Sequence, residues 1–307
     1  MKQRNNKIRF SAGSTAMRWL LRIILYGWAV TIIFPLFWTL ATSLKSSKVF
    51  MQGDVWNWPD PMYLTNFFRA WQEANMGAYT FNTLFVTVLT VVLFAIMLTT
   101  TSYILAKYDF KFVKFFEKYY FVSMMIPGML LLVPLFFQLR DVGDWLQSVI
   151  RFVTGNPNYT FVLTDNLITL SVVYAVTALP TPIFLLTGFM RGIDKSFLEA
   201  ARIDGASEMY IFTRIVLPFV KPIVLFQCLT QFMGTWNEYM TALTFLENEK
   251  NYTLSVGIQK LIAQFGYQSD YGAVFAGLII SLLPILLLYV VFQKTIQNGT
   301  DMSEGIK

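Results

Sequence analysis

Few residues in this sequence could do chemistry, and Glu238 is the most conspicuous because it is the only charged residue in six long apolar runs. It directly follows Trp236 and Asn237. An aromatic ring beside an amide and a carboxylate suits a sugar, because sugars present C–H faces to rings and hydroxyl groups to polar side chains. The alternative is structural, since tryptophan and acidic residues also mark the ends of membrane helices. Both interpretations stay open for Trp236, Asn237 and Glu238 as candidates for a substrate pathway.

Catalysis and cofactor binding have little support in the composition. The 307 residues include no histidine, which excludes histidine-based triads, metal sites and proton relays. The closest imitation of a phosphate-binding loop, residues 192–196, has Asp194 where such a loop needs glycine before its lysine. Cys228 is the single cysteine, so there is no disulfide framework. We expect no enzymatic activity, no cofactor and no metal site in this chain.

The second informative stretch is residues 191–218, which we call the elbow. Ser196 followed by Glu199 forms a capping-box pattern, so we expect a helix to start at Ser196. Apolar or small side chains at helical spacing should share one face of this helix, namely Phe197, Ala200 and Ala201. The small alanines on that face would allow a close approach to a neighbouring surface.

The elbow then changes direction. Asp204-Gly205 should end the first helix, because glycine tolerates the left-handed conformation of many helix ends. Ser207 can cap a second helix that ends near Pro218 and carries Tyr210, Ile211 and Arg214. The elbow is either an amphipathic connector or a knob that inserts into a groove on a partner. Its caps, small-residue face and glycine turn favour the knob.

Long apolar segments must position these residues. Six runs are each at least 21 residues long, and roughly 20 residues are needed to cross a hydrocarbon core of about 30 Å. Backbone groups in lipid must be satisfied within the segment, so the runs are expected to be helices. The predicted spans are Ile23–Leu44, Tyr79–Ala106, Tyr119–Leu139, Asn166–Met190, Pro222–Leu246 and Tyr271–Gln293.

The placement of basic residues predicts the orientation. With the amino terminus inside, the inside segments hold 17 of the 24 Lys and Arg residues; these segments are 1–22, 107–118, 191–221 and 294–307. Basic residues concentrate on the cytoplasmic side, so both termini are predicted to be cytoplasmic. The domains are then a cytoplasmic N-terminus (1–22), a six-helix membrane domain (23–293) and a cytoplasmic C-terminal tail (294–307). The net charge of +6 suits anionic membrane lipid and requires no nucleic acid.

Two outer loops carry further expectations. Asn66, in the tryptophan-rich loop 44–78, is expected to cap a short helix at the outer interface. The loop 140–165 places Trp145, Val149 and Phe152 on one helical face, which suggests a short interfacial helix.

The elbow resembles the EAA loop of ABC importer permeases in three successive segments, Glu199–Ala201, Asp204–Ser207 and Ile215–Pro218. The rest of the chain is similar to the carbohydrate-uptake branch, which includes the maltose permeases. Supporting segments are Asn82–Leu84, Ala106–Phe110, Trp236–Tyr239, Tyr252–Gly257 and Asn298–Lys307.

This resemblance implies an all-α, polytopic type I ABC importer permease fold in the plasma membrane of a prokaryote. It implies that the elbow is a coupling helix for an ATPase, with the coupling residues Glu199, Ala200, Ala201, Asp204, Gly205, Arg214 and Pro218. The implied partners are a second homologous permease, an ABC ATPase dimer that binds ATP and Mg²⁺, an extracellular solute-binding protein and a disaccharide or oligosaccharide. It also implies that loop 247–270 reaches toward the solute-binding protein.

The competing hypothesis is an ion-coupled secondary transporter or channel that acts without an ATPase. It requires ionisable residues near the middle of the bilayer. Glu238 lies 16 residues after Pro222, or roughly 24 Å along a helix, which places it in the outer part of the bilayer.

Overall fold

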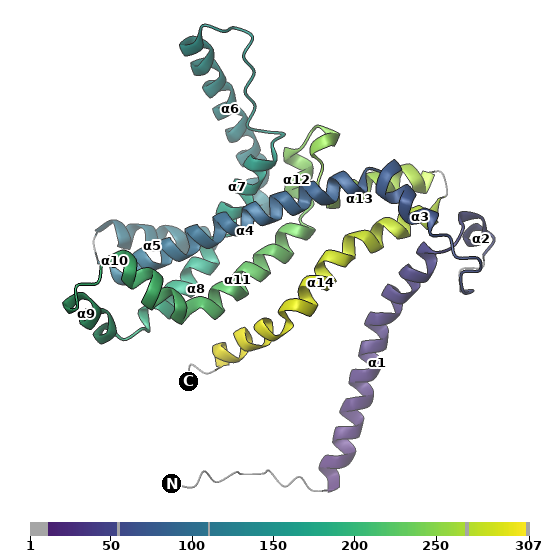
Figure 1. Ribbon diagram of the computed structural model, residues 1–307, viewed down its shortest axis with the longest axis horizontal. Helices are drawn as coiled ribbons and strands as arrows, with labels where there is room; N and C mark the ends of the chain where they lie inside the picture. The colour runs from purple at the N-terminus through teal and green to yellow at the C-terminus, as the bar shows by residue number, and fades with distance from the viewer. Residues whose placement is uncertain (1–11, 54–55, 110, 268–269, 305–307) are drawn as a thin grey trace.

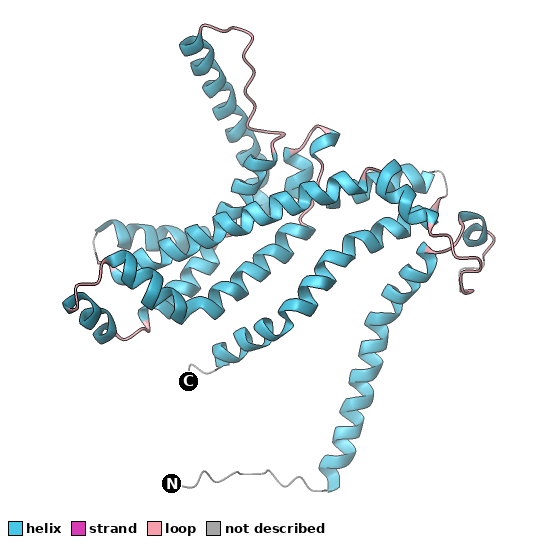
Figure 2. Ribbon diagram, in the orientation of Figure 1, coloured by secondary structure: helices cyan, strands magenta, loops and turns pink. Residues whose placement is uncertain are grey.

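The computed structural model describes residues 12–53, 56–109, 111–267 and 270–304. Within these ranges the chain forms helices and loops and contains no strand, as Figure 2 shows. The all-α prediction is therefore confirmed for the described residues. The predicted N-terminus (1–22) and tail (294–307) are described only in part, because residues 1–11 and 305–307 lie outside these ranges.

In the described part of the chain, four helical stretches are long and apolar enough to cross a membrane without a sharp bend. They are α1 (Ala12–Ser43), α4 (Met76–Lys107), α14 (Tyr271–Glu304), and the stretch formed by α10 (Glu208–Tyr210), the π-helix η2 (Ile211–Val216) and α11 (Leu217–Asn237). Two further pairs qualify when each bent pair counts as one span. They are α5 (Lys111–Ser123) with α6 (Gly128–Thr154), and α7 (Leu167–Thr177) with α8 (Pro180–Arg191). The prediction of six spans agrees with this count.

The predicted third span is wrong as a continuous helix. The run Tyr119–Leu139 divides between α5 and α6, whose axes differ by 112°. The break falls just before Pro127-Gly128, where proline disfavours a helical conformation of the residue before it. The 51° bend between α7 and α8 falls at Pro180, the first residue of α8. Each of these two breaks thus lies at a proline beside the start of a helix.

The remaining helices are short and lie mainly at the two ends of the bundle. They are α2 (Ser47–Met51), α3 (Thr65–Phe68), η1 (Arg69–Glu73), α9 (Lys195–Ile203), α12 (Met240–Phe245), η3 (Glu249–Asn251) and α13 (Leu254–Tyr267). In Figure 1, α9 and α10 lie at one end, and α2, α3 and α13 lie at the opposite end. We call these the elbow end and the α13 end.

Helix α4 is the central strut of the bundle, because it packs against α7, α8 and α11. Its buried residues Phe94, Leu98 and Leu105 join the apolar cluster at the elbow end. Its first turns contribute Met76 and Tyr79 to a second cluster at the α13 end. Helix α1 instead stands apart from the bundle at its N-terminal end and approaches α14 toward its C-terminal end (Figure 1), and its large apolar side chains from Met17 to Phe37 are exposed.

Asn66 does not cap a helix, so that prediction is wrong. It lies inside α3 and is buried, and its Nδ2 donates hydrogen bonds of 2.8 Å to the carbonyl oxygens of Ser43 and Lys45. Gly272 of α14 permits this contact, because a Cβ there would lie 2.5 Å from Asn66 Nδ2. The amide therefore joins α3 to the end of α1, in close contact with the start of α14.

The segment 140–165 contains no separate short helix. Instead α6 continues without a break to Thr154, and Trp145, Val149 and Phe152 lie exposed or half-exposed on that extension. The chain then returns along the helix. Gln147 Oε1 accepts from Phe161 N (2.9 Å), and Arg151 Nε donates to Tyr159 O (2.8 Å).

Candidate functional site

The first helix of the elbow begins earlier than the capping-box pattern predicts. Asp194, not Ser196, is the N-cap of α9, and its Oδ1 accepts a 2.9 Å hydrogen bond from Ser196 N. The same hydrogen bond lowers the pKa of the Asp194 carboxyl. The capping box of Ser196 and Glu199 is therefore a wrong prediction, because an aspartate two residues upstream takes the cap.

The glycine turn is confirmed. Gly205 has a φ of +79°, in the left-handed region that L-residues with side chains rarely adopt. Gly205 N donates to Arg202 O (3.0 Å) and Ala206 N donates to Ala201 O (2.9 Å). This pair of bonds is a Schellman motif, which satisfies carbonyl groups at the end of α9 and reverses the chain.

The second helix starts where expected but does not end near Pro218. Ser207 Oγ accepts a 3.3 Å hydrogen bond from Tyr210 N, which confirms the predicted cap. The helix then passes through η2 and continues as α11 to Asn237. The wider π-helical turn precedes Pro218, which has no N–H to offer to the preceding turn. The second helix of the elbow and the fifth span are thus one continuous helical element, from Glu208 to Asn237.

Glu208 attaches the elbow to the end of α4. Its carboxylate accepts hydrogen bonds from Tyr103 (3.0 Å) and Tyr108 (3.3 Å), and forms an ion pair with Arg202 at 2.8 Å. The ion pair also raises the pKa of Arg202. The sequence analysis missed this role, although an acidic residue directly after a helix cap was a usable signal.

The exposed surface of the elbow carries both apolar and charged side chains, and few of its side chains are buried. Leu198 is buried, and Ala201 packs beside it against the core of the elbow end. Phe197, Ile203 and Met209 are exposed, with Ile203 at 86%. Ala201 therefore does not share the exposed face of Phe197 and Ala200, contrary to expectation. The other predicted coupling residues are exposed, namely Glu199, Ala200, Asp204, Gly205, Arg214 and Pro218.

The three candidate pathway residues are placed differently from one another. Trp236 is 3% exposed, stacks on Phe232 at a centroid distance of 5.9 Å, and donates from Nε1 to Ser281 O (3.3 Å). Asn237 is exposed, and its Nδ2 donates to Met233 O at 2.8 Å. Of the three side chains, only Asn237 extends from the surface of the bundle.

Glu238 occupies a break in the fifth apolar run. It is the C-cap of α11, and its carboxylate accepts from Thr241 N (2.8 Å) and Ala242 N (3.1 Å) at the start of α12. Tyr174 of α7 donates its hydroxyl to the same carboxylate. The run Pro222–Leu246 is therefore not one helix, which corrects the predicted fifth span. Glu238 joins α11, α12 and α7.

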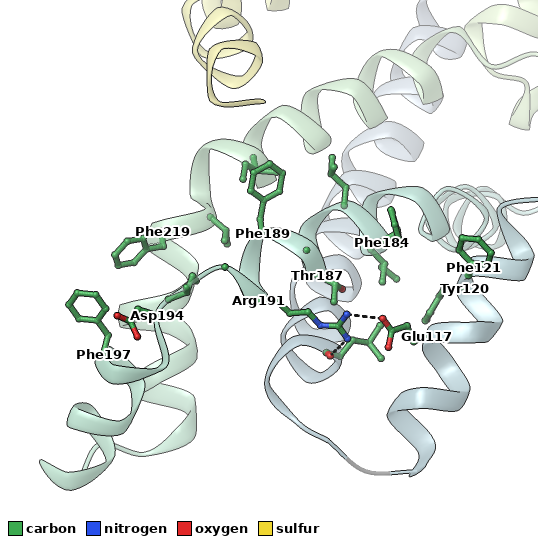
Figure 3. Close-up of a pocket in the computed structure, with 18 residues that line it drawn as sticks. Glu117, Tyr120, Phe121, Phe184, Thr187, Phe189, Arg191, Asp194, Phe197 and Phe219 are labelled. Carbon is green, nitrogen blue, oxygen red and sulfur yellow. Dashed lines mark hydrogen bonds and ion pairs between the residues drawn. The ribbon is translucent and has the colours of Figure 1, made fainter. Parts of the chain in front are cut away.

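A cavity of about 1080 Å³ lies beside the elbow (Figure 3). Arg191 stands at its rim, where it pairs with Glu117 of α5 (2.8 Å) and donates to Leu105 O of α4 (3.1 Å). Sequence patterns gave no sign of this cavity, because helices far apart in the sequence supply its walls. Among the described residues, no group of three or more His, Cys, Asp or Glu side chains could hold a metal ion.

Residues 99–301 match the sequence model of the family described as binding-protein-dependent transport system inner membrane component. The chain is 29% identical to the diacetylchitobiose uptake system permease protein NgcG of Streptomyces coelicolor, over 95% of this chain and 88% of that one. It is 29% identical to the arabinooligosaccharides transport system permease protein AraQ of Halalkalibacterium halodurans, over 96% and 98% of the two chains.

A solved structure has the same fold. It is a crystal structure of a bacterial ABC transporter involved in the import of the acidic polysaccharide alginate. One of its chains superposes with a TM-score of 0.78 at 24% identity, covering 93% of this chain and 98% of that one.

Proposed function

The chain belongs to the family of binding-protein-dependent transport system inner membrane components, and from this premise we propose that it is a permease subunit of an ATP-driven carbohydrate importer. In this proposal it forms the translocation pathway with a second, homologous permease. An ABC ATPase dimer holds ATP and Mg²⁺ and supplies the energy. The importer lies in the plasma membrane of a prokaryote, with both termini of this chain in the cytoplasm.

The observation that carries the proposal is the form of the elbow. Its backbone is fixed by two caps and a glycine turn, while Phe197, Ile203 and Met209 remain exposed. A rigid surface with exposed apolar side chains suits insertion into a complementary groove. We propose that this groove lies on the ATPase.

The continuous helix from Glu208 to Asn237 supplies a means of transmission. ATP-driven closure of the ATPase dimer would displace the elbow, and the helical connection would carry that displacement into the fifth span. Glu238 would then pass it to α7 and α12 through the bonds it accepts from Tyr174 and the α12 backbone. The spans would switch between inward-facing and outward-facing arrangements.

The names of the relatives support a carbohydrate substrate. They refer to diacetylchitobiose, arabinooligosaccharides, and melibiose, raffinose or stachyose. We therefore propose a disaccharide or oligosaccharide as cargo, delivered by an extracellular solute-binding protein to the α13 end. Asn237 is the exposed polar candidate for contact with cargo, and Trp236 would act by supporting the helix that presents it.

The coupling proposal is tested by Gly205→Val in the complete importer reconstituted in proteoliposomes. A β-branched residue at a φ of +79° is strained and should distort the turn. We expect at least a tenfold loss of ATP-dependent uptake with the protein still in the membrane. Gly155→Val is the matched control, because Gly155 also has a positive φ (+66°) but follows α6, away from the elbow. Normal uptake by Gly205→Val would overturn the coupling role.

The alternative of an ion-coupled transporter rests on Glu238, the one carboxylate within the apolar runs. Its carboxylate accepts three hydrogen bonds from this chain, which favours a structural role over ion transport. Purified chain alone in liposomes, with no ATPase or second permease, should not transport sugar. Uptake driven by an ion gradient in that preparation would establish the alternative.

A further inference from the structure

The cavity beside the elbow is lined by residues of five helices, including Leu105 of α4. Helix α5 contributes Tyr120 and Phe121, α8 contributes Phe184 and Phe189, and the remaining walls include residues of α9 and α11. Figure 3 shows these aromatic side chains around the space, with Phe197 and Phe219 on the elbow side. Most of the lining is apolar, so the cavity suits a hydrocarbon ligand better than a hydrated one.

Polar groups gather on one side of this cavity. Arg191 and Glu117 form a half-exposed ion pair there. Thr187 lies one turn before Arg191 on α8, about 6 Å along the helix axis. Thr187 is 4% exposed, and its Oγ1 is buried without a hydrogen-bond partner in the described chain. A buried hydroxyl without a partner requires an explanation, and a bound ligand with an acceptor atom supplies one.

The order of these groups matches a phospholipid. A cation at the rim, a hydroxyl one turn deeper and an apolar space beyond correspond to a phosphate, an ester carbonyl and an acyl chain. A sugar of the same volume would need hydrogen-bonding groups along its whole length. The walls offer chiefly aromatic and aliphatic carbon instead.

The surrounding charge favours an anionic headgroup. The two segments that adjoin the cavity, 107–118 and 191–221, together contain nine Lys and Arg residues against six Asp and Glu residues. Arg191 has five N–H donors, and its contacts with Glu117 and Leu105 O leave donors for a phosphate. A net basic surface attracts anionic lipid of the cytoplasmic leaflet.

We propose that this cavity binds one acyl chain of an anionic phospholipid from the cytoplasmic leaflet, with its phosphate at Arg191 and an ester carbonyl accepting from Thr187. The inference rests on the proposed function for its orientation, which puts the elbow on the cytoplasmic side. The bound chain contacts Phe219 of α11, so the lipid packs against the helix that continues from the elbow into the fifth span. Lipid occupancy then modulates coupling between the ATPase and the spans.

The test uses the complete importer in nanodiscs that contain phosphatidylglycerol with a photoreactive diazirine on one acyl chain. After irradiation and digestion, mass spectrometry should find labelled peptides from α8 and α5. Gly188→Leu should reduce this labelling at least tenfold, because a Cβ at Gly188 extends into open space within the cavity. Gly234→Leu is the control, since Gly234 also has open space around it but does not line the cavity.

A second variant tests the polar contact. Thr187→Val keeps the volume of the side chain and removes the hydroxyl, so it should weaken labelling by roughly fivefold, the equivalent of one hydrogen bond. This variant is informative even if Gly188→Leu fails to fold, because its change in shape is small.

Three results would overturn the lipid assignment. The first is unchanged labelling in both Gly188→Leu and Thr187→Val. The second is equal labelling by a phosphatidylcholine analogue with the same diazirine chain. The third is efficient cross-linking of Gly188→Cys, in a Cys228→Ser background, to the second permease, which would show that protein fills the cavity. Labelling does not depend on transport, so failure of the importer proposal and failure of the lipid site are distinguishable.

Discussion

The elbow end and the α13 end of the bundle differ in how far their own side chains cover them. At the α13 end, Leu254, Leu261 and Phe265 of α13 are each at most 2% exposed. At the elbow end, α9 buries only Leu198 and leaves Phe197 and Ile203 exposed. Helix α13 is held by intramolecular contacts along one face, whereas α9 has a fixed backbone whose large apolar side chains remain mostly exposed. That asymmetry agrees with the proposed function, in which a partner supplies energy at the elbow.

The largest effect should come from a bulky side chain placed in the close contact between α13 and α4. A Cβ at Gly257 of α13 would lie 2.1 Å from the ring of Tyr79, so Gly257→Val should destabilise the fold by about 3 kcal/mol or more. Thermal unfolding in detergent measures the loss. Gly266→Ala in the same helix is the control, because nothing lies within 4 Å of its Cβ position, and it should be neutral or stabilising. Equal melting temperatures for the two variants would contradict the close packing of α13 on α4.

The next effect concerns ion pairs. Arg69 pairs with Asp270, a residue 7% exposed that also accepts from the Ser47 hydroxyl. Arg69→Gln should cost about 2 kcal/mol, because it leaves a mostly buried carboxylate without its cation. Lys114→Gln removes an exposed pair with Asp109 near the elbow end and should change stability by less than about 0.5 kcal/mol. Chemical denaturation of both variants would show whether charge pairs stabilise the α13 end preferentially.

A smaller effect separates the cap of α9 from its proposed contact surface. Asp194→Ala should destabilise α9, seen as faster hydrogen exchange of its amides. Glu199→Ala should leave that exchange unchanged and lower only ATPase-coupled uptake, since Glu199 is exposed. Faster amide exchange in Glu199→Ala would instead support a capping box formed by Ser196 and Glu199, contrary to the structure.

The smallest effect is a pH dependence at the α13 end. The ion pair with Lys260, followed by the Tyr79 hydroxyl, lowers the pKa of Glu249 below its ordinary value of 4.5. A lowered folded pKa gives stability that is present above the unfolded value and is lost as the pH falls through the folded value. The free energy of unfolding, measured by chemical denaturation, should therefore fall below pH 4.5, and Glu249→Gln should reduce that fall by a few tenths of a kcal/mol. If wild type and Glu249→Gln lost stability equally at acid pH, the contacts of Glu249 would not contribute to the pH dependence.

Local chemistry explains which parts of the elbow were predictable. Gly205 and Ser207 act through their own backbone and the next few residues, so their roles follow from sequence alone. The start of α9 was predicted wrongly because Asp194 and Ser196 are both good caps, and the local pattern does not rank them. The length of the second helix was also missed, because Pro218 is accommodated by a π-helical turn that sequence patterns do not signal.

The sequence by itself determined the class of this protein, because six apolar runs and the spacing of Glu199, Gly205 and Pro218 can be recognised from residues that lie close together in the chain. It also identifies Glu238 as the one carboxylate in those runs. Only the tertiary structure decided what Glu238 and Trp236 do, because their partners Tyr174 and Ser281 lie on other helices. The same holds for the cavity at Arg191 and for the contrast between the two ends. Side-chain burial and pairing across helices depend on how the helices pack, and the order of residues along one helix does not contain that information.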